Sequence, residues 1–208
     1  MKKIICLLFL VNLVSLYSQD EFFKNQTGIT PFYQKLKGYE LSGTEAIGLG
    51  AYFKGGLCIQ IAEENLISEK IFVGSIGYRL TDYNELNTMP FKPYTGISFA
   101  KINDVTFVNF DFILTKCFLM NTIFPFSING STSLQTYFST SDSGGSDFLC
   151  ILGVGYNQAF FTNSIIYPVV GVAAAYDVNY GINFQTFSIG INIKLSKNKA
   201  VEKSEQVS

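Results

Sequence analysis

Hydrophobic and polar residues alternate along most of the chain, and this alternation is typical of β-strands. The clearest example lies over residues 182–195. One parity there is apolar, namely Phe187, Ile189, Ile191, Ile193 and Leu195, and the other is polar or small, namely Thr186, Ser188, Gly190, Asn192 and Lys194. Side chains at every second position of a strand point to the same face. This strand is therefore predicted to have one apolar and one polar face.

The same alternation begins near residue 44 and recurs to residue 195. Over residues 44–62 it indicates a long strand or a strand pair, with Ile47, Leu49 and Ile61 on the apolar parity. Further candidate strands cover residues 71–80, 94–102, 105–115, 117–128, 131–140, 148–160, 164–176 and 182–195. The breaks are rich in Asn, Asp, Gly or Ser, which favour turns, and fall at 63–70, 81–92, 103–104, 129–130, 141–147 and 177–181. No 11-residue stretch shows a capped helical period, so the predicted fold class is all-β.

The composition indicates a membrane protein rather than a soluble one. Hydrophobic residues make up 48% of the chain and charged residues only 15%, against about 25% charged in a typical soluble domain. Membrane-crossing strands need about 9 to 11 residues each. Residues 44–195 therefore have room for a closed antiparallel up-and-down transmembrane β-barrel of about eight strands, with ten as the alternative.

The two ends of the sequence differ from the part between them. Lys2 and Lys3 precede an apolar run over residues 4–16, which is too short for a membrane-spanning helix and predicts a secretory signal peptide, residues 1–18, cleaved after Ser18. Residues 19–43 contain Pro31 and Gly38 and are weakly patterned, so we expect a periplasmic lead-in. Residues 196–208 have little to bury and are expected to form a disordered tail.

Charge and cysteine content exclude several classes of function. The net charge is −1 with a single arginine, Arg79, which gives no basic stripe for nucleic acid. Cys58, Cys117 and Cys150 all lie in apolar segments and are interpreted as small buried hydrophobes rather than as a disulfide framework.

Two short glycine patterns accompany the alternating strands, Gly48-Leu49-Gly50 and Gly153-Val154-Gly155-Tyr156. With the predicted signal peptide and the closing strand, they make residues 44–195 resemble the broad class of small bacterial outer-membrane β-barrel domain proteins. This resemblance implies an outer-membrane location, outer-membrane lipid as the surroundings, and the barrel-assembly machinery as a partner during biogenesis. Members of the class often end on an aromatic residue that this machinery reads, whereas here the alternation stops at Leu195 and a tail follows.

Candidate chemistry is sparse. The chain has no histidine, which removes Ser-His catalysis and histidine metal ligation, and Asp111 is the clearest carboxylate within a predicted strand. We therefore expect no catalytic residues, no cofactor, no metal site and no enzymatic activity.

The polar parity of the strands supplies the candidate site. Arg79, Asp111 and Asn109 are predicted to face the lumen, and by the same parity so are four further residues, Tyr52, Gln60, Asn192 and Lys194. One interpretation is a polar network that fills a narrow barrel, because buried charges must find partners. The other is a gate or selectivity contact in a small pore.

Three functions stay open at this point. The leading one is an integral outer-membrane barrel of structural, adhesive or narrow-channel character; the interior of an eight-stranded barrel is just wide enough for side chains, so a general porin is not expected. The second is a carrier or receptor for a small apolar ligand, with Phe124, Pro125, Phe126, Phe160 and Phe161 lining a mouth. The third is a soluble periplasmic lipocalin-like barrel, whose apolar face would point inward. The oligomeric state is left open.

Overall fold

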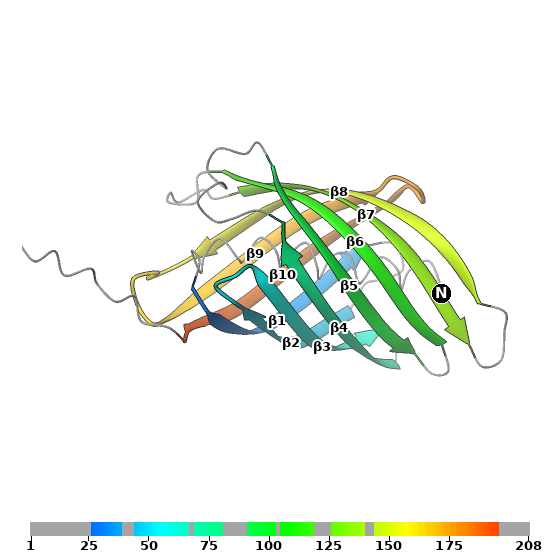
Figure 1. Ribbon diagram of the computed structural model, residues 1–208. Helices are drawn as coiled ribbons and strands as arrows, with labels where there is room; N and C mark the ends of the chain where they lie inside the picture. The colour runs from blue at the N-terminus through cyan, green and yellow to red at the C-terminus, as the bar shows by residue number, and fades with distance from the viewer. Residues whose placement is uncertain are drawn as a thin grey trace, which may run out of the picture.

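The strands form a closed barrel. The structure, a computed structural model, describes residues 26–38, 44–66, 69–80, 91–102, 105–118, 126–139 and 144–195. Ten strands lie within these ranges: β1 (Gly28–Gly38), β2 (Thr44–Tyr52), β3 (Leu57–Leu66), β4 (Glu69–Arg79), β5 (Lys92–Ile102), β6 (Val105–Phe118), β7 (Phe126–Ser139), β8 (Gly145–Ala159), β9 (Ile166–Asp177) and β10 (Ile182–Lys194). Each pairs antiparallel with its chain neighbours, and β1 pairs with β10 to close the ring (Figure 1). No helix in these ranges is long and apolar enough to cross a membrane.

The described barrel has ten strands, the larger of the two numbers expected, for two reasons. Residues 44–62 form the β2–β3 hairpin, and residues 28–38, expected to be lead-in, form β1. The barrel therefore begins at Gly28 rather than at residue 44. Pro31 obscured this strand, because a proline has no N–H to give to a ladder. The β1–β10 register correspondingly passes over Thr30 and Pro31.

The segment between β6 and β7 also differs from the prediction. Residues 117–128 are not a strand of their own, since β6 runs on to Phe118 and β7 begins at Phe126. Asn129 and Gly130, where a turn is predicted, form no turn. They lie inside β7 and pair with both β6 and β8. Ladder pairing on both sides holds this Asn-Gly pair extended, against its turn preference. The predicted signal peptide, its cleavage bond and the predicted tail lie outside the described residues.

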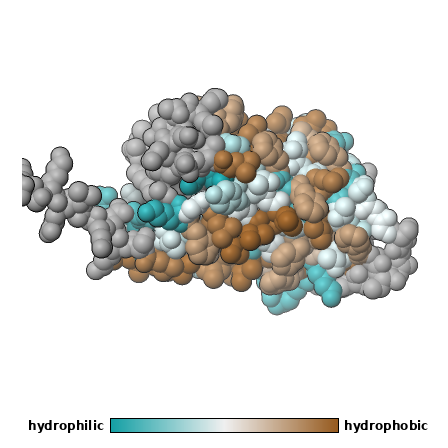
Figure 2. Space-filling view, viewed as in Figure 1, coloured by the Kyte–Doolittle hydropathy of each residue, from teal (hydrophilic) through white to brown (hydrophobic). Residues whose placement is uncertain are grey.

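The outer wall of the barrel is apolar. Outward positions carry exposed large hydrophobic side chains on every strand from β2 to β10, including Ile47, which is 67% exposed, Phe110 and Ile189. Figure 2 shows hydrophobic side chains over much of the wall that faces the viewer. This is the predicted assignment of faces, and it is the reverse of what a soluble lipocalin-like barrel requires.

One end of the barrel holds the start of β1 and the end of β10, and we call it the terminal end; the opposite end is the distal end. The connections at the distal end are residues 39–43, 67–68, 103–104, 140–144 and 178–181, each of five residues or fewer. At the terminal end they are residues 53–56, 80–91, 119–125 and 160–165. The longest connections therefore lie on the same side as the start of β1 and the end of β10.

Charged side chains border the apolar wall toward the distal end. Lys35 Nζ lies 3.3 Å from Glu45 Oε1, and Lys70 Nζ lies 2.6 Å from Glu63 Oε1. Lys101 is exposed near the distal end of β5. A change from apolar to charged residues along each strand is what a membrane-to-water boundary requires.

β8 extends past its neighbour β9 at the distal end. β9 pairs with residues Ile151 to Ala159 only. The β9–β10 turn covers part of the remaining edge, because Val178 N donates to Cys150 O at 2.9 Å and Asn179 Nδ2 donates to Phe148 O at 3.1 Å. These bonds satisfy carbonyl groups that an exposed strand edge would leave open.

Candidate functional site

A row of cross-strand neighbours, polar except for one glycine, lines the lumen. The row follows the strand register from β1 to β7 through one residue of each strand: Thr30, Gly50, Gln60, Ser75, Ser98, Asn109 and Gln135. All of its side chains are buried. Because cross-strand partners share a face of the sheet, alternation within each strand is sufficient to place the whole row inside.

Asp111 is the centre of a hydrogen-bonded group that joins three strands. Ser98 Oγ on β5 donates to Asp111 Oδ2 at 3.1 Å, and Ser133 Oγ on β7 donates to Asp111 Oδ1. Asn109 Nδ2 donates to Ser98 Oγ at 3.2 Å. Each carboxylate oxygen therefore has a hydroxyl donor, which offsets part of the cost of burying the group. We call Asp111, Ser98, Ser133 and Asn109 the Asp111 network.

The other predicted lumen residues lie apart from this network. Thr30 Oγ1 donates to Asn192 Oδ1 at 2.6 Å across the β1–β10 seam. Lys194 Nζ donates to Thr162 O at the terminal end and lies 5.2 Å from the centre of the Tyr167 ring. These contacts fix the seam and the rim rather than the centre of the lumen.

Two more predicted residues lie toward the terminal end. Tyr52 packs with Cys58, Tyr94 and Ile113 in a small buried cluster. Arg79 is buried, and its backbone N donates to Gly56 O at 3.0 Å. The side-chain donors to Asp111 within the described residues are the two serines, not Arg79.

Alternation thus placed the predicted residues on the correct face but did not group them. Tyr52, Gln60, Arg79, Asn109, Asp111 and Asn192 are all buried, and Lys194 is half-buried. Within the described residues, Ser98 brings Asn109 and Asp111 together. Sequence reasoning missed Ser98 and Ser133, although both lie on polar, inward parities. A gating role for any of these residues stays a prediction.

The distal end of the lumen holds an apolar cluster beside buried polar residues such as Glu64 and Asp177, so its interior is mixed rather than uniformly polar. Its buried cluster, which we call the distal plug, comprises Leu36, Ile71, Val73, Ala100, Phe107, Leu149, Ile151 and Phe184. The Phe107 and Tyr137 rings lie 6.1 Å apart at the edge of this cluster. These side chains come from six strands, β1, β4, β5, β6, β8 and β10, and pack together inside the distal end of the barrel.

The predicted apolar mouth is only partly described. Phe160 and Phe161 are exposed on the β8–β9 connection, and Phe161, 79% exposed, has a φ of 59°. Phe124 and Pro125 lie outside the described residues, as does the side chain of Phe126. Among the described residues, no group of three or more His, Cys, Asp or Glu side chains is placed to hold a metal ion.

The known proteins most informative for comparison are solved barrels. No family model matches the sequence, and no curated protein matches it. Neisserial surface protein A (NspA) matches at 12% identity over 81% of this chain and 96% of its own, with a TM-score of 0.35. The NanC porin matches at 8% identity over 80% and 100%, with a TM-score of 0.42. The N-terminal β-barrel domain of Pseudomonas aeruginosa OprF matches at 11% identity over 81% and 98%, with a TM-score of 0.31. At these identities no residue role is carried over to this chain.

Proposed function

We propose that this protein is an integral β-barrel of the bacterial outer membrane whose lumen is closed to solutes, so that it acts as a structural membrane component rather than as a pore or an enzyme. The observation that carries the proposal is the combination of an apolar outer wall with the bulky distal plug packed inside the barrel.

The outer wall supports the membrane location. Burial of apolar surface is worth about 25 cal/mol per Å², and soluble monomers rarely expose apolar patches beyond a few hundred Å². Here such residues face outward on strand after strand. A closed ring also satisfies its backbone groups internally, as a hydrocarbon environment demands.

Strand number supports the orientation. Ten strands place the start of β1 and the end of β10 on one side, and a barrel inserted from the periplasm would keep these two strand ends there. The terminal end would then face the periplasm and the distal end the outside. Because no distal connection exceeds five residues, long adhesive loops have no place on the outer side, and this favours a structural over an adhesive role.

The distal plug supports closure of the lumen. A pore needs a continuous path lined by polar groups or water. Toward the distal end, bulky apolar side chains pack inside the barrel, among them Phe107 and Phe184, each at most 2% exposed.

Removal of bulk from the plug should open the barrel. In planar bilayers we expect the unchanged protein to give no stepwise conductance, and the Phe107→Ala/Phe184→Ala variant to give small discrete steps, because two buried rings leave the lumen. Phe99→Ala/Phe110→Ala removes the same bulk from the outer wall and should stay silent. Stepwise conductance of the unchanged protein would overturn the closed-lumen proposal.

The location is tested by fractionating cells that express the full-length tagged chain, then comparing boiled and unboiled outer-membrane samples by gel electrophoresis. A membrane-resident band whose mobility changes on boiling is expected. A soluble periplasmic band with unchanged mobility would contradict the proposal.

A further inference from the structure

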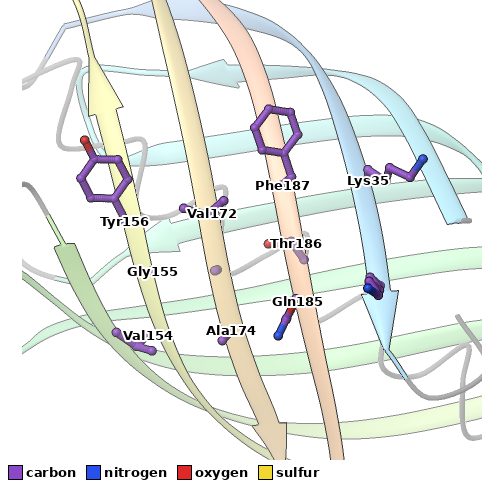
Figure 3. A pocket seen from close by; sticks show the side chains of 11 residues that line it. Lys35, Val154, Gly155, Tyr156, Val172, Ala174, Gln185, Thr186 and Phe187 are labelled. Carbon is purple, nitrogen blue, oxygen red and sulfur yellow. The ribbon is translucent and has the colours of Figure 1, made fainter. Parts of the chain in front are cut away.

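The outer wall is not uniformly convex. A depression of about 620 Å³ crosses β1, β10, β9 and β8 (Figure 3). Two adjacent register rows form it: Lys37, Gln185, Ala174 and Val154 in one, and Lys35, Phe187, Val172 and Tyr156 in the other. We call this depression the outer-wall groove.

The groove arises from a difference in side-chain size. Ala174 lies between Val154 and Gln185 and carries only a methyl group, whereas the rings of Phe187 and Tyr156 project beside it (Figure 3). Its volume falls within the range of about 300 to 1,000 Å³ that small-molecule sites occupy. A concavity in a wall that faces hydrocarbon is filled by whatever surrounds the barrel.

The two ends of the groove differ in chemistry. Its β8 and β9 part is apolar, whereas its β1 and β10 part holds Lys35, Lys37 and Gln185. Lys35 is paired with Glu45 and is still 54% exposed. Lys37 is exposed, and no carboxylate of the described residues lies within 4.0 Å of it. Within the part of the chain that the structure describes, two ammonium groups beside one carboxylate leave a net positive charge at this end.

We propose that the outer-wall groove binds an anionic lipid, with its phosphate against Lys35, Lys37 and Gln185 and an acyl chain over Ala174 and Val172. The inference rests on the proposed membrane location. The lipid supplies both required properties in one molecule, an anion at the boundary and a hydrocarbon chain beside it. A second copy of the barrel would instead press its own apolar wall against two lysines, which is unfavourable.

The test uses the full chain in phosphatidylcholine vesicles that contain a small fraction of spin-labelled phosphatidic acid, or of spin-labelled phosphatidylcholine with the same chains. The immobilised fraction of each probe gives its relative affinity for the barrel. We expect the unchanged protein to prefer phosphatidic acid, and Lys35→Gln/Lys37→Gln to lower that preference at least about tenfold, since each lysine near an anionic headgroup contributes roughly a factor of five. Ala174→Phe should reduce the immobilised fraction by filling the groove.

Matched controls lie on the opposite wall. Lys101 on β5 is an exposed lysine at the distal boundary, and Thr106 on β6 is its cross-strand partner. Lys101→Gln and Thr106→Phe should leave the preference unchanged. Inorganic phosphate added at the probe concentration should not displace the lipid, because it lacks the acyl chain.

The outcomes separate this inference from the proposed function. The boiled and unboiled mobility of the same vesicle samples reports membrane insertion independently. Three results would overturn the lipid site alone. They are inserted protein that does not prefer phosphatidic acid, a loss of that preference in Lys101→Gln as large as in Lys35→Gln/Lys37→Gln, and displacement of the lipid by inorganic phosphate. Protein that does not insert would overturn the lipid site together with the membrane location.

Discussion

Replacing Ser98 and Ser133 together by alanine should lower the free energy of unfolding by about 3 to 6 kcal/mol, because each hydrogen bond to a buried charged group contributes about 1.5 to 3 kcal/mol. Asp111 is buried between β5 and β7 and receives a hydroxyl donor on each carboxylate oxygen. The double variant removes both donors and leaves the carboxylate in place. Unfolding by urea in lipid vesicles, followed by the unboiled gel band, measures the change.

Ser131 provides the matched control for this prediction. It lies on β7 two residues from Ser133 and is equally buried, but its hydroxyl has no hydrogen-bond partner within the described residues. Ser131→Ala should therefore change the unfolding free energy little. Adding Asp111→Asn to the double serine variant removes the charge and should restore part of the stability. If the double serine variant were no less stable than Ser131→Ala, the Asp111 network would not support the barrel.

The second large effect is expected on the outer wall. Phe110→Lys should destabilise the barrel by about 2 to 4 kcal/mol in vesicles, which is the cost of a lysine at the bilayer midplane of a β-barrel. Phe110 is 51% exposed and lies in the middle of the apolar face of β6. Thr106→Lys, on the same face but near the distal boundary, should cost only about 0 to 1 kcal/mol.

This pair of variants shows whether β6 faces hydrocarbon or water. On a water-exposed surface, a change such as Phe110→Lys usually stays within about 0.5 kcal/mol. The same urea titration in vesicles compares the two lysines at two depths. Equal and small effects would mean that hydrocarbon does not surround β6.

The outer wall is the part of the fold that the sequence predicts best. The face on which a side chain such as Phe187 or Ile189 lies can be predicted from its position in the alternation alone. Both side chains are exposed on the outer wall. Alternation is unbroken over residues 186–195, and the burial pattern of β10 follows it there.

Two features were not predicted, for physical reasons. In β1, Pro31 and the outward Lys35 break the apolar parity, yet pairing with β2 and β10 holds the strand in place. In the distal plug, inward residues such as Ile71 and Leu149 are apolar like their outward neighbours. The sequence did contain a signal for the distal plug, namely apolar residues on both parities at one end of several strands.

Partners within the candidate site depend on register, which periodicity does not contain. Alternation indicates that Asp111 points inward, but a shift of two residues between β5 and β6 would keep that face and change the partner. The observed register places Ser98 on β5 opposite Asn109 on β6, and Asp111 lies two residues after Asn109 on the same strand. Hairpin geometry and closure of the ring set this alignment together.

The seam between β1 and β10 also determines how such a chain can fold. Every other pairing joins strands that follow each other in the sequence, whereas the Thr30–Asn192 bond joins residues 162 positions apart. Contacts of such high contact order form slowly, because the intervening chain must be ordered first. A growing sheet of hairpins keeps two open edges until β10 arrives, and the last strand of the chain turns the sheet into a barrel.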